Sequence, residues 1–236
     1  MTTRELQRTR PAPGITAEYV PPLHSGDRLT RRQFEYRYAT TPEKFKAELV
    51  EGVVYVSSPI SMEHGRPHGF VMAWLGAYLA GTPGVDFGDN VTVRLDAENE
   101  VQPDALLRVE KDRGGNSAVS DEGYLEGAPE LVVEIAATSA SYDLHDKLRA
   151  YRRNGVQEYA VWQVYDRKLD WFELKEGEYE PLAPDADGTI HSRVFPGLRL
   201  AVKPLLEGDL AAVLAELQKG LAMPEHVAFV EKLAGK

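Results

Sequence analysis

The sequence predicts an α/β domain built around a mixed β-sheet that is flanked by helices. The main observation is that residues 129–165 read as strand, helix and strand with short connections, the pattern of a right-handed βαβ unit with parallel strands. The second is a pair of tight-turn signals, Glu51-Gly52 and Glu176-Gly177, each between two apolar-rich runs, which add antiparallel hairpins. Because apolar residues make up 43% and charged residues 27%, the 236-residue chain has the composition of a globular protein with a packed core.

The N-terminal residues predict an extended arm. Residues 1–29 contain four prolines and show little hydrophobic periodicity. Residues 1–46 carry nine Lys and Arg against five Asp and Glu, whereas the whole chain has a net charge of −10. This basic segment has two interpretations, a solvated arm or an arm that lines a nucleic-acid groove.

Capping residues and periodicity predict the next elements. Thr30 has the side chain of a helix N-cap and precedes a short helix at residues 31–38. From His68 onward, apolar residues recur at intervals of three and four, which predicts a helix that ends at the Gly-Thr-Pro-Gly segment 81–84. Strands are predicted at 45–49, 53–56, 85–95 and 105–109.

The central βαβ unit has clear boundaries. Leu131–Ile135 is a β-branched run typical of a strand buried on both faces. Ser139 or Ser141 then opens a helix, Asn154-Gly155 closes it, and residues 159–162 form the second strand. The elements that follow are a hairpin over 169–182 and amphipathic helices at 205–221 and 224–233. The predicted division of the chain is an arm at 1–29, a core domain at 30–204 and C-terminal helices at 205–236.

The composition excludes several classes of protein. The chain has no cysteine, which rules out disulfides, thiolate metal sites and cysteine nucleophiles. No stretch approaches the roughly 18 apolar residues of a membrane span, and no apolar run follows the charges of the N-terminus. We therefore expect a cytoplasmic protein without a membrane partner. Ser139 and Ser141 lack a matching His and Asp pattern, which makes acyl-transfer chemistry a poor interpretation.

Two carboxylates predict a metal site. Glu134 lies within the apolar run LVVEI, where a charge is unfavourable unless it is paired or bound to a metal. Asp104 follows Gln102-Pro103 and directly precedes a strand, so it lies at that strand's mouth. Two acids at adjacent strand ends suit a hard cation such as Mg²⁺ or Mn²⁺. The alternative is that Glu134 pairs with an arginine and Asp104 caps a turn.

Lys147 is the third candidate. It flanks the apolar stripe of the helix in the βαβ unit. Its ammonium is either held near the carboxylates, where it would stabilise phosphate charge, or extends from the edge of the buried face into solvent. The sequence leaves both interpretations open.

Several motifs occur together in a fixed order. These are Gln102-Pro103-Asp104, Glu134-Ile135, the helix residues Asp143, Lys147 and Tyr151, and Gly155-Val156-Gln157-Glu158-Tyr159 with Trp162. In combination they resemble the Uma-type family of restriction endonucleases, a bacterial family of the PD-(D/E)XK nuclease superfamily. The resemblance extends upstream to Glu48 and the following residues up to Gly52, and to His68, so it covers roughly residues 30–200.

The resemblance implies a restriction-endonuclease-like core, metal-dependent hydrolysis of DNA phosphodiester bonds and a homodimer. It implies that Asp104, Glu134 and the Ile135 carbonyl bind Mg²⁺ or Mn²⁺, and that Lys147 completes the catalytic set. The superfamily pattern places a lysine two residues after the glutamate, where this chain has Ala136. The implied replacement is Lys147, from the following helix.

The resemblance also assigns two supporting residues. Glu48 is implied as an accessory acid near the site and His68 as a polar contact at its rim. For His68, an ordinary role at the start of a helix is an equal alternative, and His64 competes for the same position.

We therefore expect a Mg²⁺-dependent endonuclease acting on DNA. One alternative is a catalytically inactive nuclease-fold module that acts in binding or assembly, which the net charge of −10 and Ala136 favour. Another is a hydrolase for a small phosphodiester or nucleotide, which also fits an acidic surface.

Overall fold

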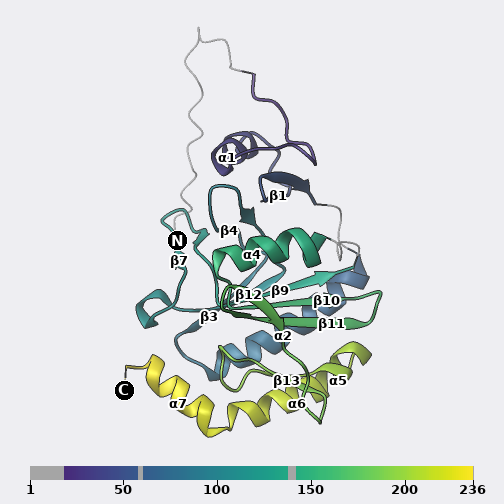
Figure 1. Cartoon of the computed structure of the whole chain (residues 1–236), viewed down its shortest axis with the longest axis vertical. Coiled ribbons are helices and arrows are strands. Elements are labelled where there is room, and N and C mark those ends of the chain that lie inside the picture. The colour runs from purple at the N-terminus through teal and green to yellow at the C-terminus, as the bar shows by residue number, and fades with distance from the viewer. Residues whose placement is uncertain (1–18, 58–60, 138–141, 236) are drawn as a thin grey trace, which may run out of the picture.

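The computed structural model describes residues 19–57, 61–137 and 142–235 (Figure 1). Residues 1–18 of the predicted arm lie outside the described residues, as do Ser139 and Ser141, the predicted start of the central helix. Within the described residues, no helix combines the length and the apolar character that a membrane span requires.

The central layer of the fold is a six-stranded mixed sheet, here called sheet B, with the order β12-β11-β10-β9-β6-β3. β9 and β10 are parallel neighbours, which confirms the predicted βαβ unit, and the other pairs of sheet B are antiparallel. Its strands are β3 (Val85–Asp89), β6 (Ala105–Val109), β9 (Leu131–Ala136), β10 (Glu158–Gln163), β11 (Lys168–Lys175) and β12 (Glu178–Pro181).

A second six-stranded sheet, sheet A, has the order β2-β1-β5-β4-β8-β7. The β1–β2 hairpin turns at Glu51-Gly52, as the sequence predicts, and β4 and β8 are parallel. Its strands are β1 (Ala47–Val50), β2 (Val53–Val56), β4 (Val93–Arg94), β5 (Glu100–Val101), β7 (Ala118–Val119) and β8 (Leu125–Glu126). A short ribbon pairs β13 (Thr189–His191) with β14 (Arg199–Ala201).

Helices cover both faces of sheet B. Figure 1 shows α4 on one side of the sheet and α2, α6 and α7 on the other, with α1 and β1 at the top. One apolar cluster joins α2 and α6 to the sheet, and a second joins α4 to the opposite face. The helices are α1 (Arg31–Tyr38), α2 (Met62–Gly81), α4 (Leu148–Asn154), α5 (Val202–Glu207), α6 (Leu210–Leu221) and α7 (Pro224–Leu233). Two single turns are η1 (Lys111–Arg113, 3₁₀) and η2 (Asp143–Lys147, π).

Local signals account for several of these elements. Thr30 accepts the backbone N–H of Gln33, and the Gln33 side chain bonds back to the Thr30 backbone, a capping box that starts α1 where predicted. Gly155 ends α4 with a φ of 82°, a left-handed conformation that glycine adopts readily.

Three predicted elements differ from the structure. The predicted helix at His68 begins six residues earlier, at Met62, and contains Pro67. The apolar spacing that predicts the helix starts only after His68, so it does not mark the first turns. The single strand predicted at 85–95 is two strands in different sheets, separated at Asn90, whose φ is 52°. The helix predicted at 205–221 divides into α5 and α6 at Gly208.

We expect Gly220→Ala to lower the free energy of unfolding by about 1–3 kcal/mol. α6 packs so closely on the Gly197 turn that a Cβ at Gly220 would overlap the Gly197 carbonyl oxygen. The matched control is Gly76→Ala in α2, where a Cβ meets no atom within 4 Å. This control should leave stability unchanged or raise it by up to about 1 kcal/mol. Equal effects of both variants in urea denaturation would contradict the packing described.

Candidate functional site

Asp104 and Glu134 lie next to each other at one edge of sheet B. The antiparallel ladder of β6 and β9 pairs Ala105 with Val133, and the next residue on each strand is one of the two acids. Asp104 Oδ2 also accepts the backbone N–H of Ile135 at 2.7 Å, which fixes the Asp104 side chain against β9. The structure therefore brings these two carboxylates to one place and pairs neither with an arginine among the described residues.

Strand alternation sends both carboxylates toward the same helix. Successive side chains of a strand point to opposite faces of the sheet. Leu106 and Val132, two positions from Asp104 and Glu134, both pack in the apolar cluster on the α4 side. Both acids therefore face η2 and α4.

Glu134 is held by two donors from that helical segment. Its side chain is 3% exposed. Glu134 Oε1 accepts the Lys147 ammonium at 2.9 Å and the Tyr151 hydroxyl at 2.8 Å, and neither bond uses Oε2. The sequence motifs include Tyr151 but assign no role to its hydroxyl, because residue spacing does not reveal where a phenol finds an acceptor.

Negative charges surround Glu134. Burial raises the pKa of Glu134 well above its usual value, and the carboxylates of Asp143, Asp104 and Glu48 raise it further, while Lys147 opposes them. Burial and the neighbouring acids thus disfavour the charged form of Glu134, which a further positive charge nearby would favour.

Lys147 lies inside the protein and not at a solvent-exposed edge. It is 3% exposed, and its Nζ lies 2.9 Å from Glu134, 3.0 Å from Glu48 and 3.9 Å from Asp143. Although burial opposes the charged form, these carboxylates raise the pKa of Lys147 well above its usual value. Lys147 is thus a charged ammonium at the centre of an acidic cluster.

A π-helical turn positions Lys147 beside the carboxylates. The segment η2 carries Asp143 and Lys147 at its two ends, and both side chains are buried. Single π-helical turns are rare and occur frequently at functional sites. The Lys147 ammonium also lies 5.3 Å from the ring centroid of Tyr142, within the range of a cation–π contact.

Glu48 connects the site to sheet A. It belongs to β1, and its Oε1 accepts the backbone N–H of Gln102 at 2.6 Å in addition to the Lys147 ammonium. Gln102 precedes Asp104 by two residues. Glu48 therefore lies beside the two acids, at the place where the sheets meet.

His64, not His68, contacts the Asp104 carboxylate. His64 Nε2 lies 3.1 Å from Asp104 Oδ1, whereas His68 Nε2 lies 3.0 Å from the Asp104 carbonyl oxygen and 3.1 Å from Asp89 Oδ1. The bond to Asp104 raises the pKa of His64. Burial acts to raise the pKa of Asp104, but His64 and the Ile135 N–H lower it overall.

The spacing of His64 from His68 was the signal that could have placed His64 at the site. His64 and His68 are one helical turn apart on α2, and their rings stack with centroids 6.0 Å apart. Because the prediction started the helix at His68, it placed His64 before the helix and not on the face that meets Asp104.

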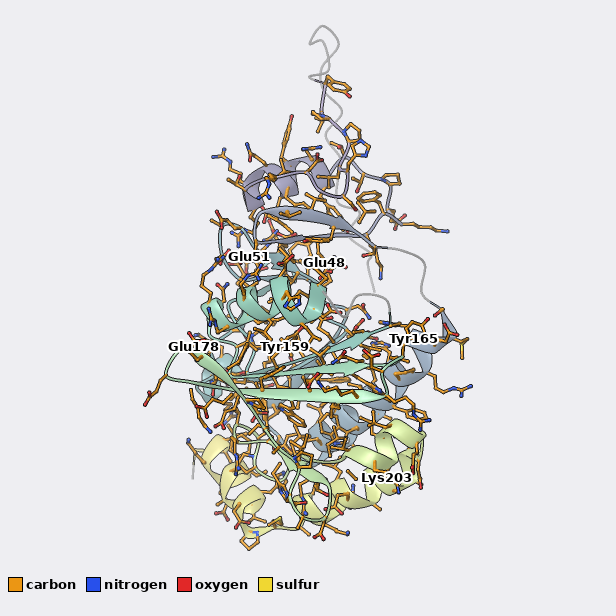
Figure 2. The ribbon with its side chains drawn as sticks, turned by 45° about the vertical axis from the view of Figure 1, so that its right-hand side comes forward. Glu48, Glu51, Tyr159, Tyr165, Glu178 and Lys203 are labelled. Atoms are coloured by element: carbon orange, nitrogen blue, oxygen red, sulfur yellow. The ribbon has the colours of Figure 1, made fainter. Side chains whose placement is uncertain are left out.

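Most of these residues line one cleft of about 1040 Å³, although His68 and Tyr151 are not among its lining residues. Its floor holds Glu48, Asp104, Glu134 and Lys147. Its other lining residues include Lys44, Lys46, Glu63, His64, Tyr142 and Tyr165. Figure 2 shows Glu48 between the hairpin of sheet A and α4, and Tyr165 at one end of the strands of sheet B.

The oxygen donors of the cleft fit a hydrated cation better than a closed metal cage. Within the described residues, no group of three or more His, Asp or Glu side chains is arranged to hold a metal ion. Two carboxylates and one carbonyl are hard ligands, and Mg²⁺ keeps several waters when a protein supplies few ligands. The donor chemistry at Asp104, Glu134 and Ile135 is therefore compatible with Mg²⁺ or Mn²⁺.

The chain is similar to known proteins in both sequence and fold. A family model described as "Uma2: Putative restriction endonuclease" matches residues 32–203. The crystal structure of "a putative nuclease" from Anabaena variabilis ATCC 29413 is similar, with a TM-score of 0.57. The two sequences are 12% identical, and the match covers 73% of this chain and 97% of that chain. None of the curated proteins matches the chain.

At this level of identity the structural neighbour shows the fold alone, and it confirms the predicted mixed α/β fold with flanking helices. The family model spans most of the chain and includes Glu48, Asp104, Glu134 and Lys147. The chain therefore belongs to the Uma2 family.

Proposed function

We propose that this protein is a divalent-metal-dependent endonuclease that hydrolyses phosphodiester bonds in DNA. The observation that carries the proposal is the charge of the cleft floor, where one ammonium contacts three carboxylates and Asp104 adds a fourth nearby. A buried cluster of this kind favours a further positive charge. A hydrated divalent cation supplies that charge and is also what phosphodiester hydrolysis needs.

Asp104, Glu134 and the Ile135 carbonyl would hold Mg²⁺ or Mn²⁺. When bound, such an ion lowers the pKa of a water and neutralises charge on phosphate oxygens. His64 and the Ile135 N–H each bind one oxygen of Asp104, and the Tyr151 hydroxyl binds Glu134, so both acids are oriented in advance.

Lys147 is the group proposed to stabilise the phosphate in the transition state. Its ammonium is held between Glu48 and Glu134, so its position is fixed before substrate arrives. Ala136 lies on the same face of β9 as Glu134, two residues along, and its small side chain packs in the apolar cluster on the α4 side. A lysine from the helix can therefore occupy the region that a lysine at 136 would reach.

The proposal includes DNA as substrate and a homodimer as the assembly, both of which the family resemblance implies. Lys44 and Lys46 support the choice of a nucleic acid. Both are exposed side chains that line the cleft, and neither has an ion-pair partner among the described residues. They are available to contact phosphates.

Glu134→Gln should reduce Mg²⁺-dependent nicking of supercoiled plasmid at least about 100-fold, the scale for loss of one electrostatic group in an active site. The amide keeps the shape of the side chain but loses the charge that would hold the cation. Glu178→Gln is the matched control, because its carboxylate is 71% exposed and lies at the opposite end of sheet B from Tyr165 (Figure 2). Undiminished nicking by Glu134→Gln, with the fold verified by circular dichroism, would refute the proposal.

Mg²⁺ or Mn²⁺ should raise the thermal midpoint of the wild-type protein by roughly 5–10 °C at a concentration about 100 times the Kd, through preferential binding to the folded state. Differential scanning calorimetry measures the shift. Glu134→Gln should lose most of it and Glu178→Gln should retain it. Metal binding without cleavage of any DNA would instead favour the inactive binding module, and the absence of a shift would contradict the metal site.

Lys147→Met should destabilise the metal-free protein by about 3–5 kcal/mol, because it leaves buried carboxylates without their counter-charge. Mn²⁺ should recover more stability in this variant than in the wild type, since the cation no longer competes with the ammonium. Denaturation with and without Mn²⁺ measures both effects. The control is Lys203→Met on α5, whose side chain is 81% exposed (Figure 2), and which should change stability by less than about 0.5 kcal/mol. Equal effects of the two substitutions would contradict the role of Lys147.

A further inference from the structure

Tyr165 is an exposed tyrosine that lines the cleft. Tyr165 lies in the turn between β10 and β11 and is 59% exposed. Because β9 and β10 are parallel, the carboxyl end of β10 meets the same edge of sheet B as the β9 end near Glu134. Tyr165 and Glu134 both line the cleft, and Figure 2 shows Tyr165 at this end of the strands.

Tyr165 is held in place although its ring is exposed. Its hydroxyl donates to Glu63 Oε2 at 2.9 Å, and Glu63 lies in the first turn of α2. One end of the side chain is therefore fixed by the turn and the other by the helix. A large aromatic group that is both exposed and oriented can stack on a ligand with little further loss of conformational freedom.

The cleft also offers cations on the sheet A side. Lys44 and Lys46 precede β1, the strand that carries Glu48, and both line the cleft. The cleft thus combines ammonium groups, which bind phosphates, with an aromatic ring, which stacks on bases. Proteins that bind single-stranded nucleic acids combine the same two kinds of group.

The size of the cleft favours a single strand. Its volume of about 1040 Å³ is at the upper limit of pockets for small ligands, which span roughly 300–1,000 Å³. Such a space accommodates a few nucleotides of one strand but does not enclose a duplex. In a duplex, moreover, the base pairs stacked above and below each base cover the ring faces that Tyr165 would contact.

We propose that Tyr165 stacks on an unpaired base, so that the substrate is a nucleic acid with unpaired nucleotides at the scissile position. This inference rests on the proposed nuclease function and narrows its substrate class. Supercoiled plasmid also contains transiently unpaired segments. Because every base has a stacking face, the contact supplies affinity without sequence preference.

The test measures binding separately from cleavage. Fluorescence anisotropy compares a labelled oligodeoxythymidine with a labelled duplex of the same length, at fixed ionic strength and with Ca²⁺ in place of Mg²⁺. The wild type should bind the single strand more tightly than the duplex. Tyr165→Ala should weaken single-strand binding roughly 5- to 100-fold, the range for loss of one base-stacking ring, and should change duplex binding far less.

Two variants serve as controls. Tyr165→Phe keeps the stacking ring and should retain most of the single-strand affinity, although it loses the bond to Glu63. Tyr36→Ala removes a tyrosine that is 54% exposed on α1, outside the lining of the cleft, and should bind as the wild type does. Thermal midpoints should be similar for all three variants.

Wild-type affinity in Tyr165→Ala, equal losses in Tyr165→Ala and Tyr36→Ala, or a wild-type preference for duplex would each overturn the inference. The nicking assay with Glu134→Gln judges the nuclease proposal separately. If nicking depends on Glu134 but binding does not depend on Tyr165, only the substrate class is wrong. If the wild type binds neither oligonucleotide and nicks no plasmid, both proposals fail.

Discussion

One buried ammonium ties the two sheets together. Lys147 contacts Glu134 on the central strand β9 and Glu48 on the hairpin of sheet A, and it reaches both from the π-helical turn that precedes α4. A buried carboxylate without a counter-charge is strongly unfavourable, so the positions of these three elements depend on each other. The cleft lies where they meet. The contacts of Lys147 hold the two sheets together, and they also fix its ammonium beside Glu134 and Glu48. The residue that stabilises the fold is therefore also one that the proposed chemistry uses.

The acids around Lys147 outnumber that ammonium, and they gather where β6 and β9 meet the hairpin of sheet A. Antiparallel pairing of β6 with β9 sets Asp104 beside Glu134, while strand alternation turns both toward η2 and α4. Another buried acid of sheet B has a different kind of partner. Glu158 on β10 accepts bonds from the Ser192 hydroxyl and the backbone of Arg193. In the cleft, by contrast, Glu48, Asp143 and Glu134 share the Lys147 ammonium, which is why a metal-assisted reaction is proposed there.

The sequence predicts the parts of this arrangement that depend on neighbouring residues. The βαβ unit, both hairpins and the cap at Thr30 are local patterns, and the structure confirms them. The two sheets were not predicted, because assigning β3 and β4 to different sheets depends on partners distant in the chain. The contact between His64 and Asp104 was missed because the apolar spacing, which begins after His68, does not mark the true start of α2. Glu134 stood out because a charge in an apolar run is rare, whereas the Tyr151 hydroxyl gave no such signal.

The central claim is that a divalent cation binds between Asp104 and Glu134 while Lys147 remains beside them. Anomalous diffraction at the manganese edge, from crystals of the wild-type protein grown with Mn²⁺, measures this directly. The account predicts one strong peak about 2.0–2.4 Å from oxygens of both carboxylates, with the Lys147 ammonium still bound to Glu48. A manganese peak on other residues would contradict it. The absence of any peak, with Lys147 and Tyr151 still bound to Glu134, would contradict it as well.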